Sequence, residues 1–198
     1  MRDPQATKDS IILASAKLFN TQGYKATSLS DITKETGLTK GAIYRHFINK
    51  EDLEKQALQS LSNLMFTSLR NRIKKANNFH DKMEAVFGFF ENYLKSPLIQ
   101  GGCPLLNVAI EADDAHPVLK EQAQQMLSSL RSSISTLIQN GINNNQVKKD
   151  TNVNFYASVF ISTLEGGIMM SKLEGNGTGL RHAVTHLRQV TQFISLKT

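Results

Sequence analysis

The amino-acid sequence predicts an all-α protein. Apolar residues recur every three or four positions in one segment after another, which is the helical period. Residues that cap helices stand at the starts of several of these segments, and strand-like alternation is absent beyond Asn77. We therefore expect about nine helices, arranged as an N-terminal three-helix helix-turn-helix domain followed by a larger helical domain.

Residues 4–22 form the first expected helix. Asp3 and Pro4 can start it, and Gly23 can end it. The inward face is expected to carry Ile12, Ala16 and Phe19, with Leu13 beside them.

The segment 28–50 contains two short helices and a tight turn. Ser28 stands three residues before Asp31, which is the spacing of a capping box. Gly37 can supply the left-handed conformation that ends the first helix, and Thr39 can cap the second. The pattern predicts helix, turn, helix.

The second of these helices has two different faces. Ile43 and Phe47 are four residues apart and pack inward, whereas Lys40, Gly41, Tyr44 and Arg45 face outward. Cations can contact phosphates, arginine can reach guanine edges, and glycine lets the backbone come close. This face therefore favours the major groove of duplex DNA.

A long helix is expected over residues 50–75. Asn49 can cap it, and Ile48 is placed to pack against Leu53 as a hydrophobic staple. Because this helix leaves the DNA-binding segment and enters the body, we interpret it as the link that transmits a signal between them. We expect a DNA-binding domain over residues 1–50 and a second domain over residues 51–198.

Further helices are expected along the rest of the chain. Their ranges are 81–95 ended by Pro97, 105–112, 118–140 ended by Gly141, 153–173 and 180–194. The polar loop between Gly141 and Asp150 is expected to be mobile.

The net charge is unevenly distributed along the chain. Residues 1–75 contain 13 Lys or Arg and 7 Asp or Glu, whereas residues 76–198 contain 10 of each. A basic N-terminal segment is typical of a protein that binds a polyanion, although a solvated basic face is the alternative. The chain has no apolar run long enough to span a membrane, and its single cysteine cannot form an intrachain disulfide. We expect a cytoplasmic protein without membrane contact.

The run from Gly23 to Leu53, GYKATSLSDITKETGLTKGAIYRHFINKEDL, resembles the DNA-binding segment of the TetR/AcrR family of bacterial transcriptional regulators. The resemblance implies a ligand-responsive regulator, most often a repressor, that binds a near-palindromic operator as a dimer. Carried over position by position, it implies a DNA-contact set of Ser28, Ser30, Thr39, Lys40, Gly41, Tyr44, Arg45, His46 and Lys50.

The last two expected helices carry more apolar surface than one core requires. By the resemblance they would pair with a second copy in a four-helix bundle, and Gly166 with Gly167 would permit close approach. The expected interface comprises Tyr156, Phe160, Leu164, Gly167, Leu187 and Val190. The alternative is that both helices complete the core of a monomer.

The resemblance also implies a small-molecule effector pocket in the body. Candidate lining residues are Met65, Phe66, Phe87, Phe90, Tyr93, Asn107, Met126 and Phe160, although such aromatic and Met residues are more often plain core. We expect no cofactor. The effector would prefer a spacing of the two recognition helices that does not fit the operator, with a coupling of about 1–3 kcal/mol between the two sites.

Other residues carry weaker hypotheses. Cys103 could sense oxidants but is more often an inert apolar residue, and His182 with His186 has metal-ligand spacing without a further ligand nearby. The acidic cluster at 111–114 is expected on a loop rim. No catalytic constellation is present, so we expect no enzyme. A helical protein that sequesters a small molecule is the alternative function, and it would bind DNA without a preferred site.

Overall fold

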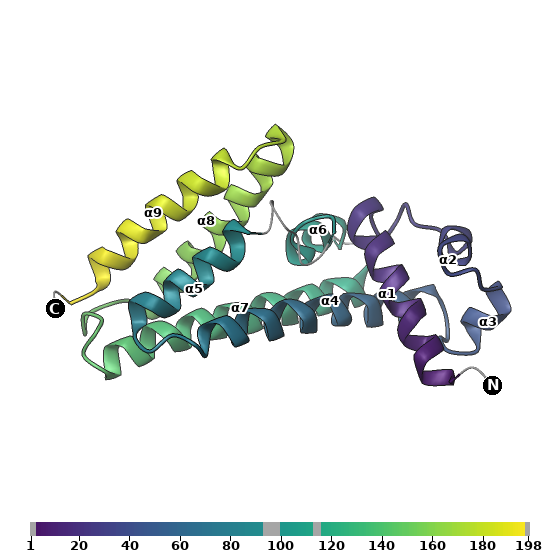
Figure 1. The fold of residues 1–198 in the computed structure, drawn as a ribbon, viewed down its shortest axis with the longest axis horizontal. Coiled ribbons are helices and arrows are strands. Elements are labelled where there is room, and N and C mark those ends of the chain that lie inside the picture. The colour runs from purple at the N-terminus through teal and green to yellow at the C-terminus, as the bar shows by residue number, and fades with distance from the viewer. Residues whose placement is uncertain (1–2, 93–99, 113–115, 197–198) are drawn as a thin grey trace. The chain divides into compact units, whose positions relative to one another are not determined.

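The computed structural model describes residues 3–92, 100–112 and 116–196. Within these ranges the chain is helical, which confirms the all-α class, and the extended pairing is confined to one antiparallel bridge between Val147 and Ser195. The helices are α1 Pro4–Gln22, α2 Leu29–Thr36, α3 Lys40–Tyr44, α4 Lys50–Ile73, α5 Phe79–Glu91, α6 Pro104–Glu111, α7 Pro117–Asn143, α8 Val153–Glu174 and α9 Thr178–Ile194 (Figure 1).

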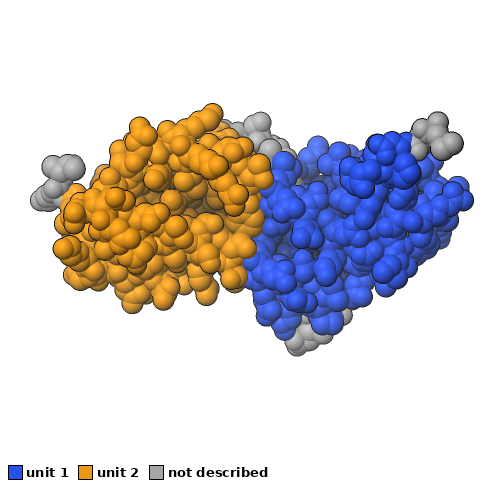
Figure 2. Space-filling model, turned by 90° about the horizontal axis from the view of Figure 1, so that it is seen from below, with its two compact units in different colours: residues 1–65, 99–126 blue, residues 66–98, 127–198 orange. Residues whose placement is uncertain are grey.

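The chain divides into two compact units, coloured separately in Figure 2. The first unit comprises residues 1–65 and 99–126, and the second comprises residues 66–98 and 127–198. This division differs from the expected boundary at residue 50, because the first part of α4 and the whole of α6 pack with the N-terminal helices.

The core of the first unit is built on α1. Ile11 and Phe19 are fully buried, and the Phe19 ring stacks on Tyr24 with centroids 5.0 Å apart. Ala16 and Phe19 of the expected inward face are buried, but Ile12 is only half-buried while its neighbour Ile11 is fully buried, and Leu13 is 68% exposed.

The second unit packs α8 along α9 and α5 against α9. Gly167 permits close contact of the first pair, because a Cβ added to it would lie 2.7 Å from the Ala183 Cβ. An ion-pair network joins the second pair: the Arg188 guanidinium lies 3.0 Å from Glu84 and 3.2 Å from Glu91. These carboxylates, Glu84 foremost, raise the Arg188 pKa and keep its charge fixed.

The bounds of helix α5 differ from expectation. Helix α5 starts earlier than predicted because Asn78 caps it, accepting a hydrogen bond from the Asp81 amide, and it ends at Glu91. Pro97 lies outside the described residues.

Helix α7 continues through Gly141 instead of ending there. Glycine is used here for space, since an added Cβ would lie 2.5 Å from Val147 and 3.1 Å from the Phe79 ring. The loop that follows is paired with the chain's last helix: the Lys148 amide donates to Ile194 O at 2.9 Å, and the Leu196 amide donates to Gln146 O at 3.0 Å.

Candidate nucleic-acid interface

The helix-turn-helix forms as its caps predict. The Ser28 hydroxyl accepts from the Asp31 amide at 3.2 Å, while the Asp31 carboxylate accepts from the Ser28 amide at 2.8 Å. Gly37 adopts φ 69°, and the Thr39 hydroxyl accepts from the Ala42 amide at 3.2 Å. The expected capping box, left-handed glycine and second cap are all confirmed.

The capping box also lowers the pKa of the Asp31 carboxyl. The Ser28 hydroxyl is the first cause and the Ser28 amide the second. Because the pKa is lower in the folded chain than in the unfolded chain, the contribution to stability is present above the unfolded value. It is lost as pH falls through the folded value.

Helix α3 presents the expected polar face. Ile43 and Phe47 are buried against the rest of the unit, and the residues of the outward face are all exposed: Lys40, Gly41, Tyr44 and Arg45. His46 is half-buried, at the edge of this face. The arrangement places a cation, a phenol and an uncovered stretch of backbone on one short helix, and a second cation, Arg45, at its C-cap.

Some of the remaining residues of the expected DNA-contact set already form hydrogen bonds or ion pairs within the protein. Ser30 and Thr39 are exposed, but the Ser28 hydroxyl donates to Asp31 at 2.6 Å. The Lys50 ammonium donates to Tyr24 O at 2.8 Å and pairs with the Glu54 carboxylate at 3.0 Å. Lys50 therefore supports the first unit, and its contact with DNA stays a prediction.

The start of α4 is capped as predicted, but the staple is wrong. Asn49 Oδ1 accepts from the Asp52 amide at 2.8 Å, and Asp52 Oδ2 accepts from the Ile48 amide at 3.1 Å. The Ile48 side chain is 89% exposed while Leu53 is fully buried, so the two do not pack together. This exposed isoleucine, between α3 and α4, is a feature that the sequence pattern did not reveal.

The two compact units divide the charge differently from the two parts of the sequence. The first unit contains 10 Lys or Arg and 11 Asp or Glu, whereas the second contains 13 and 6. Four cations counted with the N-terminal segment, at positions 70, 72, 74 and 75, belong to the second unit. The α3 face is therefore basic because Lys40 and Arg45 lie on it, although the net charge of the whole unit is close to zero.

Four residues of the expected dimer interface are interior. Phe160, Leu164, Gly167 and Leu187 are buried within one protomer. Gly167 faces α9, and the Phe160 ring stacks on Phe87 of α5 with centroids 6.0 Å apart. Tyr156 and Val190 are half-buried. A different row of α8, at alternating spacings of four and three residues, is exposed at four positions and half-buried at Val159 and Gly166, and we call it the α8 stripe. Its members are Phe155, Val159, Ser162, Gly166, Met169 and Leu173.

The expected effector residues do not form one described pocket. Tyr93 lies outside the described residues, and Met65, Phe87, Phe90, Met126 and Phe160 are buried. The Asn107 amide is already bonded to Asn20 and Gly101 O. Phe66 lines a groove of about 310 Å³ between the end of α4 and α7.

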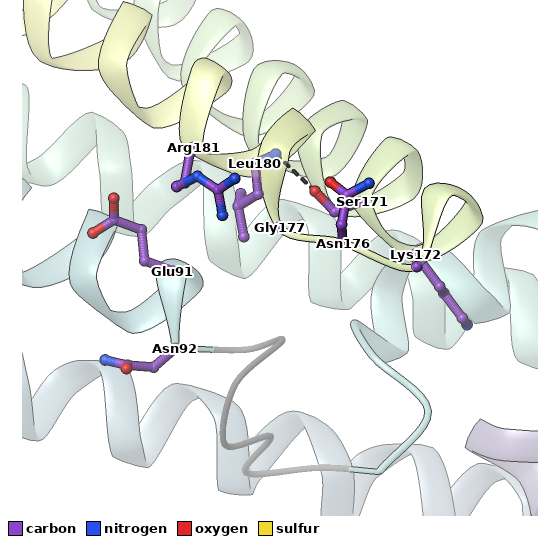
Figure 3. Close-up of a pocket in the computed structure, with 9 residues that line it drawn as sticks. Glu91, Asn92, Ser171, Lys172, Asn176, Gly177, Leu180 and Arg181 are labelled. Carbon is purple, nitrogen blue, oxygen red and sulfur yellow. Dashed lines mark hydrogen bonds between the residues drawn. The ribbon is translucent and has the colours of Figure 1, made fainter.

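A larger pocket, of about 570 Å³, lies in the second unit where α5 ends and α8 turns into α9. Figure 3 shows Glu91 at the end of α5 and Asn92 directly after it, opposite Arg181 on α9, with Lys172 near the end of α8. The Leu180 amide donates to the Ser171 hydroxyl at 2.8 Å at its inner side. Its lining is mostly polar and charged, unlike the Phe and Met lining that the sequence predicted.

The other candidate residues have plain surroundings. Cys103 is buried directly before α6, and His182 and His186 are exposed on α9. The described part of the chain holds no group of three or more metal-ligating side chains. Asp113 and Asp114 of the acidic cluster lie outside the described residues, and the Glu111 carboxylate accepts from the Lys25 amide at 3.1 Å. None of the helices described is both long and apolar enough to span a membrane.

The capped helix pair and the exposed face of α3 define a helix-turn-helix DNA-binding protein. Residues 11–57 match the model of bacterial regulatory proteins of the tetR family, and residues 80–187 match the tetracyclin repressor-like C-terminal domain. The chain belongs to the TetR family of transcriptional regulators, as the resemblance of residues 23–53 indicated. This is a family of regulators and not of enzymes.

Solved structures and curated relatives match this chain over most of their length. A TetR transcriptional regulator from Chloroflexus aurantiacus J-10-FL is 35% identical, with a TM-score of 0.94 over 100% of both chains. A TetR-family regulator from Cytophaga hutchinsonii is 30% identical, with a TM-score of 0.92 over 100% of this chain and 99% of that one. The repressor DhaR of Mycobacterium sp. strain GP1 is 23% identical over 85% of this chain and 84% of its own.

Proposed function

We propose that this protein is a repressor that binds a near-palindromic operator as a homodimer and is released by a small-molecule effector. The observation that carries the proposal is the α3 face, where Lys40, Tyr44 and Arg45 are exposed over a buried Ile43 and Phe47. A side chain held this way can reach base edges without first unpacking the unit. The name of the relative DhaR supports repression. As a regulator of bacterial DNA, the protein would act in the cytoplasm without a cofactor.

The α8 stripe supports the dimer. Phe155 is 57% and Leu173 is 81% exposed, and a Cβ added to Gly166 between them meets no atom within 4 Å. Apolar and small residues at alternating spacings of four and three suit packing against a second helix. A twofold axis through this stripe would place two α3 helices on two half-sites, about 34–36 Å apart or a multiple of that distance.

The effector is proposed to bind the second unit. The pocket of about 570 Å³ has the size of a small-molecule site. Its lining of Glu91, Lys172 and Arg181 suits a polar, charged compound better than the apolar one that the sequence pattern suggested. Release requires that this compound bind the DNA-free conformation more tightly than the DNA-bound one.

The test is binding to duplexes selected from random DNA, compared with scrambled duplexes of equal length at near-physiological salt. We expect selection to converge on a two-fold symmetric sequence, bound by a dimer at least about a thousandfold more tightly than scrambled DNA. Equal affinity for both would contradict the proposal and leave the small-molecule sequestering protein as the better reading.

A further inference from the structure

Helix α9 carries two exposed histidines one helical turn apart. In the part of the chain that the structure describes, the imidazoles of His182 and His186 have no hydrogen-bond, ion-pair or ring partner. Residues four apart lie on one face of a helix, with Cβ atoms about 5–6 Å apart. Two histidines at this spacing can bind one zinc ion together. Each copy of the chain therefore offers two nitrogen ligands side by side on its surface.

These histidines lie on the same outer face as the α8 stripe. Gly167 of α8 faces Ala183 of α9, since a Cβ added to the glycine would lie 2.7 Å from the Ala183 Cβ. At 3.6 residues per turn, the α8 stripe lies about 100° round α8 from this contact, on the side away from the buried residues. An exposed row of α9 lies equally far round its own helix and on the same side, and we call it the α9 row. Its members are His182, His186, Gln189 and Phe193.

The histidines are also close to the middle of this face. The contacts Gly167–Ala183 and Met170–Gly179 show that α8 and α9 run antiparallel. Counting back from the first contact places His186 level with the middle of the α8 stripe. Because a twofold interface is symmetric, groups near its centre meet their own copies across the axis. A dimer through this face would therefore bring together two histidine pairs, one from each copy.

We propose that His182 and His186 of two copies bind one divalent transition-metal ion, such as Zn²⁺, between them. The inference rests on the proposed dimer and adds a ligand site that one copy cannot complete, because the described part of the chain holds no group of three or more metal-ligating side chains. Four imidazole nitrogens suit the tetrahedral coordination of Zn²⁺, whereas Mg²⁺ prefers oxygen ligands. The ion would hold the two copies together more tightly without being a cofactor that the dimer requires.

Sedimentation equilibrium of the untagged protein, first treated with a chelator and then measured with and without Zn²⁺, tests the inference. With Zn²⁺ well above its own dissociation constant, we expect the dimer dissociation constant to fall by at least about tenfold. Calorimetric titration should give one ion per dimer. Co²⁺ in place of Zn²⁺ should show the visible absorption of a tetrahedral site, and Mg²⁺ should have no effect.

Histidine variants show which side chains bind the ion. His182→Gln and His186→Gln should each remove the Zn²⁺ effect and the tetrahedral Co²⁺ spectrum. Since both side chains are exposed, each variant should change the metal-free dimer constant by less than about threefold. The matched control is His80→Gln, which replaces a single exposed histidine near the start of α5 and should keep the full response to Zn²⁺.

The outcomes separate this inference from the dimer on which it rests. A dimer that forms without metal and is unchanged by Zn²⁺ overturns the metal site and leaves the proposed function intact. One ion per copy with no change in the dimer constant overturns the bridge between copies. A full Zn²⁺ response after both histidines are replaced overturns the assignment to α9. If the protein is monomeric with and without Zn²⁺ and binds no duplex as a dimer, the proposed function fails and the inference fails with it.

Discussion

Lys40 begins α3 and Arg45 caps its end; both side chains are exposed, but their chemistry differs. Arginine can form paired hydrogen bonds with a guanine edge, whereas an ammonium acts mainly on phosphates. Arg45→Ala should cost about 1–3 kcal/mol on the selected duplex and relax the sequence preference. Lys40→Ala should weaken all duplexes alike and reduce the salt slope by about one.

Titration of both variants against selected and scrambled duplexes at several salt concentrations checks this division. Equal loss on both duplexes for Arg45→Ala would show that Arg45 does not read bases. Lys40 is the appropriate probe of phosphate contact, because replacing Lys50 would also break its bonds to Tyr24 O and Glu54.

The residues that cap the helices of the helix-turn-helix were predictable from the sequence. The capping box at Ser28 and Asp31 is closed by atoms three residues apart, so the local pattern is sufficient. The buried Asn20, whose side-chain amide donates to Gln100 O and Gly102 O, was missed because these partners are 80 and 82 residues away. The available signal was a polar residue next to Phe19 on the inward side of an apolar helix.

At the scale of elements, neighbouring glycines on α8 have opposite surroundings. A Cβ on Gly167 would lie 2.7 Å from Ala183, and one on Gly166 would meet open space. Gly167→Ala should therefore destabilise the fold by about 1–3 kcal/mol through overpacking. Gly166→Ala should stabilise α8 in the protomer by up to about 1 kcal/mol while weakening the dimer.

Denaturant unfolding at several protein concentrations gives the stability, and sedimentation equilibrium gives the dimer dissociation constant. A dimer unaffected by Gly166→Ala would place the interface elsewhere than the α8 stripe. The apolar periodicity predicted helix α8, but it could not predict which face of α8 packs on α9, because that depends on packing between helices. For that reason the expected interface included four residues that are interior.

At the scale of the whole molecule, the difference in net charge between the two units leads to a prediction about DNA affinity. The basic excess belongs to the second unit, while the first unit is nearly neutral. If the α3 face alone contacts the operator, the double substitution Arg70→Gln and Lys74→Gln should change the affinity for the selected duplex by less than about threefold.

Lys40→Gln, which removes a single charge from α3, should cost more than that double change. Fluorescence anisotropy on one labelled duplex compares the two proteins directly. A larger loss of affinity in the double variant would mean that the second unit also contacts the DNA. Counting charges along the sequence could not tell whether one unit or both contact DNA, because helix α4 is divided between the two units.

Helix α3 is only five residues long, from Lys40 to Tyr44. A helix of this length can place about three or four side chains on base edges. A half-site defined so briefly recurs by chance on the order of once in a few hundred base pairs, whereas two half-sites at fixed spacing multiply their rarity. The second half-site would then add its rarity only because two copies of α3 are held at one distance, which the proposed dimer interface on the α8 stripe would set.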